Sequence, residues 1–462
     1  MTIPTPTATT IASDAAELLA PVPELTLVVD EPTERIGSCW IPVACSALVV
    51  GASLFAAPTL TDSLTARPIS DATLHLSRAY RVLAPICDTL DAISLFSLGQ
   101  HLAFLATCAL VFTSWRVFLS QNSRRRLRKR DELTAASQAL LVVLSIYVGG
   151  ALLPRPITRL AMSSPDAVVV DFHSHTRYSW DGRSDFSPEE SRRWHHASGF
   201  DVAYITDHGT FAGAEAAARN NPPRAGDATV MLSGIEVRDR GNHLVVLGTD
   251  AADWQSYTAG DLHERIFERE TASRGAARPV ALFTLPGNLK SESAMAVDGI
   301  ELSDAAPRGL AESDRERAEI VALAHGQKKS LVASSNNHGW ASASPAWSVM
   351  QIHGWRAMTP AQLDVAIREQ ILDRGLSAVE VIDRRVVGPT SFIGLSLTVP
   401  AAAWRILQTM SWSERISWLI WIWLGYAAVV RVEKFRRREK RDAQQQSKFR
   451  TFTRWLRAAQ IA

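Results

Sequence analysis

The arrangement of hydrophobic and polar positions divides the chain into regions of two kinds. Long apolar runs occupy residues 40–57, 92–119, 140–154 and 416–430. Between the third and the fourth run, from about Asp166, short apolar runs alternate with stretches of helical periodicity. The long runs are typical of membrane-spanning helices, and the alternating region is typical of an α/β domain.

The four long apolar runs are predicted to be transmembrane helices. The third and fourth are shorter than the roughly 20 residues that a bilayer requires, but mild flanking residues can extend them. Buried core helices are the alternative interpretation. The flanking charges favour insertion, because the basic clusters RRRLRKR (124–130) and FRRREKR (435–441) follow the second and fourth runs.

The basic clusters also predict a topology. Basic loops remain on the cytoplasmic side of a membrane, so both termini are expected in the cytoplasm and the α/β domain outside it. This predicts a multi-pass protein of the inner membrane. The clusters could instead be nucleic-acid patches, but their position beside apolar runs favours the topological role, and the net charge of only +2 gives no sign of duplex nucleic-acid binding.

The expected domain organisation has five parts. In chain order they are a disordered tail, three transmembrane helices with their loops, an α/β domain, an interfacial segment with the fourth transmembrane helix, and a basic cytoplasmic tail: 1–35, 36–160, 161–400, 401–435 and 436–462. The chain has four cysteines, which all lie in the first quarter: Cys39, Cys45, Cys87 and Cys108. Neither a disulfide framework nor cysteine-ligated zinc is therefore expected in the α/β domain.

The α/β domain contains predicted strands separated by helix signals. Seven runs rich in β-branched residues are predicted strands: AVVVDF, VAYIT, TVMLSGIEV, HLVVLG, VALFTL, GIEL and LVASS. Ser187 and Pro188 open one helix that Gly199 closes, and Ser313 and Thr359 open two others. This alternation predicts a mostly parallel sheet, and about seven units favour a small barrel.

Histidines and carboxylates follow the ends of several predicted strands. In chain order these residues are His173, His175, Asp181, Asp207, His208, Glu236, His243 and His338. Strand ends are where α/β folds place their sites. His173 and His175 project to the same side of a strand. Imidazole nitrogens and carboxylate oxygens together favour zinc, manganese or iron over calcium or magnesium.

Each of these residues also has a structural interpretation. An isolated pair of histidines can lie on the surface, the TDH sequence at 206–208 can cap a helix, and Glu236 can belong to an ion pair. Their joint occurrence at successive strand ends favours a metal site.

Six segments of the domain share a resemblance to one family. They read HSHTRYSWDG, HASGFDVAYITDHGT, SGIEV, HLVVLG, DGIELSD and SSNNHGW. Together, over about residues 167–340, they resemble the motifs of the PHP superfamily, the polymerase and histidinol phosphatase metal-dependent phosphoesterases. The resemblance implies a PHP-like distorted (β/α)7 barrel that binds up to three ions and hydrolyses phosphate mono- or diesters by a metal-bound hydroxide.

The resemblance also implies a ligand set. One ion would be held by His173, His175 and Glu236, and a second would share Glu236 and add His243. A third would be held by Asp181, His208 and His338. Asp207 would orient a ligand histidine. The residues expected to be catalytic are His173, His175, Asp207, Glu236 and His338.

Two positions depart from the family pattern. Leu285 stands where the family has a histidine before a proline, and Asn336 stands where it has an aspartate two residues before His338. Leucine cannot bind a metal, and the Asn336 amide oxygen, still a possible ligand, brings no charge. These departures support one alternative to the phosphoesterase, a sensor or binding domain that does not catalyse. A second alternative is an enzyme with a related amidohydrolase-like site that cleaves C–N bonds.

The substrate class follows only in outline. Arg177, Arg238, Arg240 and Lys290 lie near the motifs and are candidates to bind phosphate. A phosphorylated small molecule, a nucleotide or a lipid head group is expected as substrate, with the lipid bilayer as a partner. His101 is a polar residue within the second apolar run, and the sequence identifies no partner for it.

Overall fold

A computed structural model describes residues 39–123, 129–239, 242–252, 254, 278–284, 297–384 and 392–459. Contacts divide the chain into one unit at Cys45–Ala428 and a second made of its two ends. The first unit contains the sheet, the candidate site and most of the apolar helices, and it is the unit described below. The predicted disordered tail at 1–35 lies outside the described residues.

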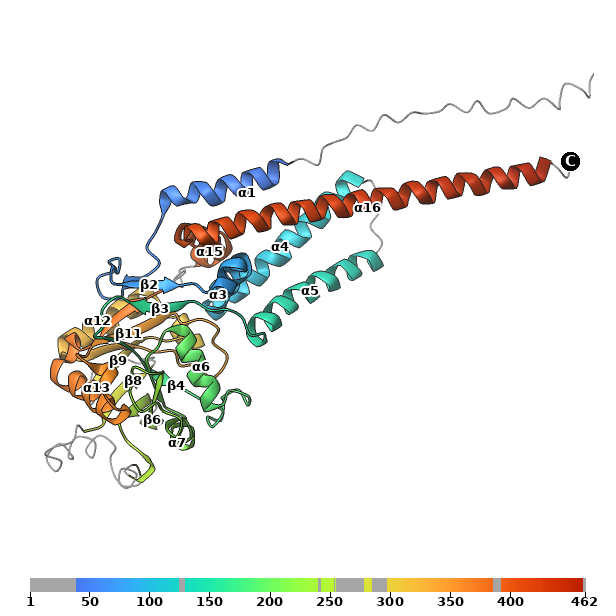
Figure 1. Cartoon of the computed structure of the whole chain (residues 1–462). Coiled ribbons are helices and arrows are strands. Elements are labelled where there is room, and N and C mark those ends of the chain that lie inside the picture. The colour runs from blue at the N-terminus through green and yellow to red at the C-terminus, as the bar shows by residue number, and fades with distance from the viewer. Residues whose placement is uncertain are drawn as a thin grey trace, which may run out of the picture. The chain divides into compact units, whose positions relative to one another are not determined.

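The main sheet has ten strands in the order β1-β12-β11-β4-β5-β6-β7-β8-β9-β10. Its strands are β1 (Thr61–Asp62), β4 (Ala167–Ser174), β5 (Val202–Ile205), β6 (Val230–Asp239), β7 (Asn242–Leu247), β8 (Val280–Thr284), β9 (Gly299–Ser303), β10 (Ser330–Ala333), β11 (Ala346–Gln351) and β12 (Glu380–Asp383). A separate ribbon pairs β2 (Ala72–His75) with β3 (Arg159–Met162). The main sheet is curled into a half-barrel, in agreement with the predicted α/β class (Figure 1).

The sheet is mixed, whereas the sequence predicted a mostly parallel one. Parallel ladders join β4 to β5, β5 to β6, β8 to β9 and β9 to β10. The ladders that β7 forms with β6 and β8 are antiparallel, as are those of β11 with β4 and β12. Only two residues separate β6 from β7, which is too short for the crossover that parallel strands need.

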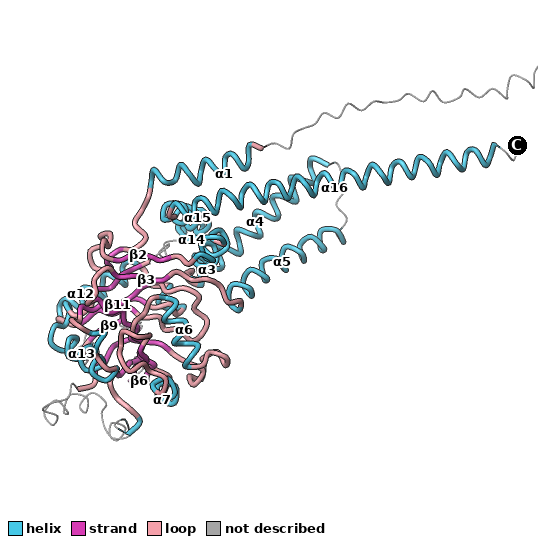
Figure 2. Tube along the Cα trace, viewed as in Figure 1, coloured by secondary structure: helices cyan, strands magenta, loops and turns pink. Residues whose placement is uncertain are grey.

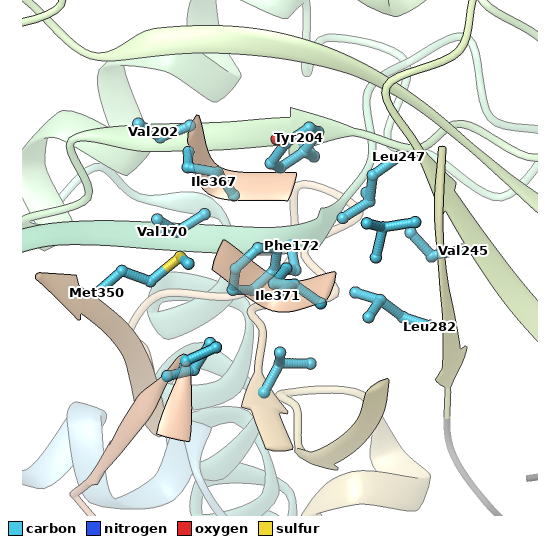
Figure 3. Close-up of a cluster of buried hydrophobic side chains, with 14 of the residues drawn as sticks. Val170, Phe172, Val202, Tyr204, Val245, Leu247, Leu282, Met350, Ile367 and Ile371 are labelled. Atoms are coloured by element: carbon cyan, nitrogen blue, oxygen red, sulfur yellow. The ribbon is translucent and has the colours of Figure 1, made fainter. Parts of the chain in front are cut away.

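The strands form because their side chains are buried on both faces. All eight residues of β4 are buried, which matches its near-continuous apolar sequence. In the main core, Val170 and Phe172 of β4 and Leu282 of β8 lie among side chains of β5 and β7 (Figure 3). Ile367 and Ile371, from helix α13 (Pro360–Arg374), pack into the same cluster.

Helices α6 (Pro188–Ser198), α7 (Ala212–Ala218), α11 (Pro307–Leu310), α12 (Asp314–Gln327) and α13 (Pro360–Arg374) belong to the same domain. Three predicted helix starts are confirmed: the side chains of Ser187, Ser313 and Thr359 each accept a hydrogen bond from the first turn. Gly199 ends α6 with φ of 92°, the left-handed conformation that glycine adopts without strain.

Within the described residues, three helices are long and apolar enough to cross a membrane, by length and composition. They are α4 (Leu98–Ser123), α5 (Lys129–Leu152) and α16 (Trp412–Ala459), and they are drawn in Figure 2. The first predicted span, at 40–57, forms the shorter helix α1 (Trp40–Gly51) and a 3₁₀ turn. The short helices α2 (Arg78–Val82), α3 (Ala84–Ser94), α14 (Phe392–Ser396) and α15 (Thr398–Thr409) lie between these elements in the chain.

The predicted span at 92–119 is interrupted, because α3 ends at Ser94 and α4 begins at Leu98. A capping box marks the break: Gln100 N donates to Ser97 Oγ at 3.3 Å, and Ser97 N donates to Gln100 Oε1 at 2.8 Å. This Ser-x-x-Gln signal is visible in the sequence, but the surrounding apolar residues concealed it.

The segment between α1 and α3 contributes one strand to the main sheet. In it, β1 pairs with β12 at Thr61 and Asp383, which lie 322 residues apart in the chain. The α/β domain is therefore completed by residues that precede α4.

Candidate metal centre

The carboxylate of Glu236 on β6 is surrounded by four imidazoles. Its Oε2 lies 3.1 Å from His173 Nε2 and 3.2 Å from His175 Nε2. The same oxygen lies 3.2 Å from His208 Nδ1, and Oε1 lies 2.5 Å from His243 Nδ1. Glu236 is 3 % exposed, so its charge is held almost entirely out of water.

The strand ends bring these groups together. The ladder between β4 and β5 shifts register between Asp171 and Ser174, just where the HxH sequence begins. Beyond the shift, Ser174 forms a bridge with Asn337 after β10. His208 follows β5 and forms a bridge with Glu236 on β6. Side chains from four strands therefore meet at one end of the sheet, as the sequence predicted for its candidate residues.

A second group of ligands lies beside the first. Asp181 carboxylate oxygens lie 3.1 Å from His338 Nδ1 and 3.5 Å from His208 Nε2. The rings of His175 and His338 stack with centroids 3.9 Å apart. Asp181 reaches this position because the loop after β4 turns back tightly: a Cβ on Gly182 would lie 2.1 Å from the carbonyl oxygen of Thr176.

Two buried carboxylates, which the sequence analysis did not select, complete the cluster. Glu301 on β9 lies 3.4 Å from His173 Nδ1, and Asp304 follows it within reach of the same ring. Asp304 Oδ2 accepts a hydrogen bond from Asn336 Nδ2 at 2.9 Å. Both residues belong to the DGIELSD segment, whose position at a strand end was the available signal. Position 336 itself has no carboxylate, but the carboxylate of Asp304, just after the neighbouring strand β9, lies beside it.

Asn336 is the unusual ligand candidate. Its φ is 43°, a left-handed conformation that asparagine tolerates better than most residues. Its Oδ1 lies 3.0 Å from His338 Nε2, so the amide contacts both Asp304 and the histidine. Asn336 therefore lies within the cluster, with its oxygen toward an imidazole and its nitrogen toward a carboxylate.

Other buried polar groups hold the ligands in place. Ser179 Oγ lies 3.1 Å from His175 Nδ1. Asp171 Oδ2 lies 2.8 Å from Nε2 of His195, a residue that the sequence analysis left as structural. Asp207, expected to orient a ligand histidine, accepts hydrogen bonds from Thr176 N and Oγ1, each at 2.7 Å. Asp207 thus fixes the loop after β4, which follows His175.

The electrostatics of the cluster are dominated by these close pairs. Burial alone would lower the pKa of His173, but the carboxylates of Glu236 and Glu301 outweigh it and hold this pKa well above its usual value. Burial opposes the charge on Glu236 as well, yet the neighbouring histidines hold its pKa far below the usual range. Burial lowers the pKa of His338 to about 4 and that of His175 well below its usual value.

The cluster fits divalent cations by its donor chemistry. Among the described residues there are four groups of three whose possible ligand atoms lie within 4.8 Å of one another. Three of these groups centre on the histidines, and the fourth joins His173 to Glu301 and Asp304. Asp181 Oδ1 and His338 Nδ1 are buried without a hydrogen-bond partner in the described part of the chain, as is Glu301 Oε1. Buried nitrogen and oxygen atoms that face one another in this way are the arrangement that a cation satisfies.

The four candidate phosphate-binding residues differ in position. Arg238 is exposed, and its Nε lies 3.2 Å from His243 Nε2 at the edge of the cluster. Arg177 is exposed and lies over the ring of Tyr178 instead. Arg240, Lys290 and Leu285 lie outside the described residues.

Comparison with known proteins gives likenesses of fold only. No family model matches the chain. No curated protein matches it either.

Similar solved structures include a lesion-specific endonuclease from Pyrococcus furiosus. The match has 14 % identity and a TM-score of 0.32, and it covers 45 % of this chain and 56 % of the endonuclease. A two-domain protein from Bacteroides vulgatus, with a domain described by prediction as a PHP-like metal-dependent phosphoesterase, has 14 % identity, coverages of 44 % and 63 %, and a TM-score of 0.30. An amidohydrolase from Chromobacterium violaceum has 16 % identity, coverages of 42 % and 98 %, and a TM-score of 0.27. Likenesses at these scores carry no argument about activity.

Proposed function

We propose that the protein is a membrane-anchored, metal-dependent phosphoesterase with a PHP-like site. The observation that supports this most directly is the convergence of His173, His175, His208 and His243 on the buried carboxylate of Glu236. Bound divalent ions would supply Lewis acidity, which lowers the pKa of a coordinated water and offsets phosphoryl charge. Zinc, manganese and iron suit this donor set.

The residues of the chain have distinct tasks in this proposal. His173, His175 and Glu236 hold one cation, and Asp181, His208 and His338 hold another. His243, half-buried at the edge, and Glu236 frame a further position. Arg238, beside His243, binds a phosphoryl oxygen of the substrate. Glu301 and Ser179 fix the orientation of the two imidazoles at the end of β4.

The reaction is a hydrolysis that balances without a further reactant. The oxygen of water forms a bond to phosphorus while the bond from phosphorus to the ester oxygen breaks. The leaving oxygen takes up a proton and departs as an alcohol. The sheet holds the ligands rigidly, so the cations and the phosphoryl group would meet with little rearrangement.

The proposal includes an inner-membrane protein whose hydrolase domain lies outside the cytoplasm. This topology rests on two basic clusters: residues 124–130, which follow α4, and residues 435–441, which lie within α16. Alkaline phosphatase fused after residue 160 should be active, and the same enzyme fused after Arg130 should be inactive. The reverse pattern would place the hydrolase domain in the cytoplasm.

The activity is tested with the full chain in a phosphate-free detergent. The chain is loaded with manganese or zinc and offered panels of phosphomonoesters, phosphodiesters and amides, beside a His173→Ala variant. Hydrolysis of phosphoesters by the wild type alone supports the proposal. Hydrolysis of amides alone would instead assign the C–N activity.

A binding domain without turnover is the second candidate. It is favoured by Asn336, which brings an uncharged oxygen where a carboxylate would offset the charge of a cation. Metal binding by the wild type with no hydrolysis of any ester in the panels would establish this candidate and reject the enzyme.

A further inference from the structure

A cavity of about 610 Å³ extends from the metal centre to the beginning of the candidate span α4. The metal-centre residues that line it are Asp181, His208, Glu236, His243, Asn336 and His338. This end of the cavity is rich in nitrogen and oxygen donors and suits a phosphoryl group in contact with cations.

The rest of the cavity lining is mainly apolar. Phe96, from the junction of α3 and α4, and Leu98, in the first turn of α4, form an apolar wall with Leu310 of α11 and Trp340. Ser94 and His101 also line it, with several alanines after β9 and β10. Among the described lining residues, those outside the metal centre include no Asp, Glu, Lys or Arg. The cavity is therefore amphipathic along its length.

The apolar wall is attached to two candidate spans. His101 Nδ1 on α4 lies 3.0 Å from the hydroxyl of Tyr147 on α5. Ser342, in the loop that carries Trp340, donates to the carbonyl oxygen of Gly150 on α5 at 3.2 Å. The end of the cavity far from the metal centre is thus at the ends of the helices that would enter the bilayer.

Exposed tryptophans lie around the metal centre. Trp180 is 78 % exposed, with its ring centroid 5.8 Å from that of His208. Trp340 is 54 % exposed, in the loop just after His338. Exposed tryptophan is costly in water but is favoured at the interface between membrane and water. Tryptophans at these positions suit a site whose mouth meets lipid head groups.

We infer that the substrate is an amphiphilic phosphoester, with its phosphate at the metal centre and its hydrocarbon chain along Phe96, Leu98 and Trp340. This rests on the proposed phosphoesterase activity and names its substrate class. A nucleotide fits this cavity less well, because bases and riboses require hydrogen-bonding groups, and the described lining beyond the metal centre supplies few of them.

The inference is tested by paired esters that share one head group. The manganese-loaded full chain, in dodecyl maltoside, is offered dodecyl phosphate against ethyl phosphate, and lysophosphatidylglycerol against glycerophosphoglycerol. Burying two methylene groups is worth about tenfold in binding, so kcat/KM should be at least ~100-fold higher for the long-chain member of the hydrolysed pair. Equal rates within the pair, or faster hydrolysis of a nucleotide, would overturn the inference while leaving the phosphoesterase proposal intact.

A matched pair of substitutions on α4 locates the effect. Leu98 and Leu110 are 67 % and 66 % exposed, and Leu110 lies about 18 Å further along the helix, away from the cavity. Leu98→Ser should lower the long-chain to short-chain ratio at least ~threefold, because it removes apolar surface from the wall. Leu110→Ser should leave the ratio unchanged. An equal fall in both variants would indicate a general effect of the detergent-facing surface and contradict the inference.

Crosslinking gives a readout that does not depend on turnover. A dodecyl phosphate with a diazirine at the end of its chain should label residues 94–101 of the manganese-loaded protein, and excess dodecyl phosphate should prevent the labelling. Labelling spread along the whole of α4, or unaffected by competitor, would overturn the inference. If every ester is inert but residues 94–101 are labelled specifically, the phosphoesterase proposal fails and the amphiphile site stands.

Discussion

Two buried clusters of charge differ in how their carboxylates are compensated. At the metal centre, Glu236 faces imidazoles. In the second cluster, Asp91 on α3 is 1 % exposed and contacts two guanidinium groups. Arg384, just after β12, donates to it at 3.0 Å, and Arg155, after α5, donates from the other side. The Tyr80 hydroxyl adds a third donor at 3.1 Å.

The difference follows from the chemistry of the cations. Arginine remains charged at every accessible pH, so the Asp91 cluster is already neutralised and needs no further ion. An imidazole can lose its proton and then offers a lone pair. Several imidazoles around one carboxylate can therefore hold a metal, whereas a carboxylate between two arginines forms a structural joint. Here the joint links α3, the segment after α5 and the edge of the sheet.

The largest effect is expected from removing the carboxylate shared by the histidines. Glu236→Ala should lower phosphoester hydrolysis at least ~10³-fold, because it removes the negative charge that holds two neighbouring cations. The fall should come with reduced metal content. Above the raised pKa of His173, the stability of the metal-free protein should change little, because the imidazoles are then uncharged. If the variant keeps the metal content of the wild type, whatever its rate of hydrolysis, the result would contradict this role.

The reverse pattern is expected at the second cluster. Asp91→Ala leaves Arg155 and Arg384 without their buried partner, and should lower the free energy of unfolding by about 3–5 kcal/mol. Thermal unfolding in detergent would measure this loss with and without manganese. The decrease should be the same in both conditions, and a decrease confined to the manganese-loaded form would break the distinction between the clusters.

A smaller effect is expected from the carboxylate behind the first histidine. Glu301→Gln keeps the shape of the side chain but removes the charge that orients His173. Metal affinity should fall by about 10- to 100-fold, and activity should return at higher metal concentration. Titration with manganese would show the shift. A loss that no metal concentration restores would mean that Glu301 acts on the substrate itself.

The smallest effect is a dependence of metal binding on pH. The pKa of His173 is raised, so in the metal-free protein its ion pair stabilises the fold at low pH and this contribution is lost as the pH rises through the raised pKa. Manganese competes with the same proton. The increase in Tm on adding manganese should therefore grow from pH 6 to pH 8. An increase that becomes smaller with pH would contradict the ligand role.

Sequence reasoning located the elements whose signals are local. The strands from β4 to β10 carry β-branched runs, and α6, α12 and α13 carry cap residues that the structure uses. β1, β11 and β12 were not predicted, because their pairing depends on distant partners such as Thr61 with Asp383. The break between α3 and α4 was missed because an apolar sequence surrounds its capping box.

The same limit applies to the site. The predicted residues His173, His175, Glu236 and His243 are brought together at the strand ends, which follows from the position of each residue relative to its own strand. Glu301 was not selected although its segment ends a predicted strand, because its contact with His173 joins residues that lie 128 positions apart in the chain. The Asp91 cluster was also not predicted, since its two arginines lie 64 and 293 residues away in the chain.

Metal content tests the central claim most directly. The full chain is loaded with manganese, freed of unbound ion by gel filtration and analysed for metal, beside a variant that combines His173→Ala with His175→Ala. The account predicts at least one bound ion per wild-type chain and fewer in the variant. Equal metal contents in the two proteins, or none in either, would contradict it.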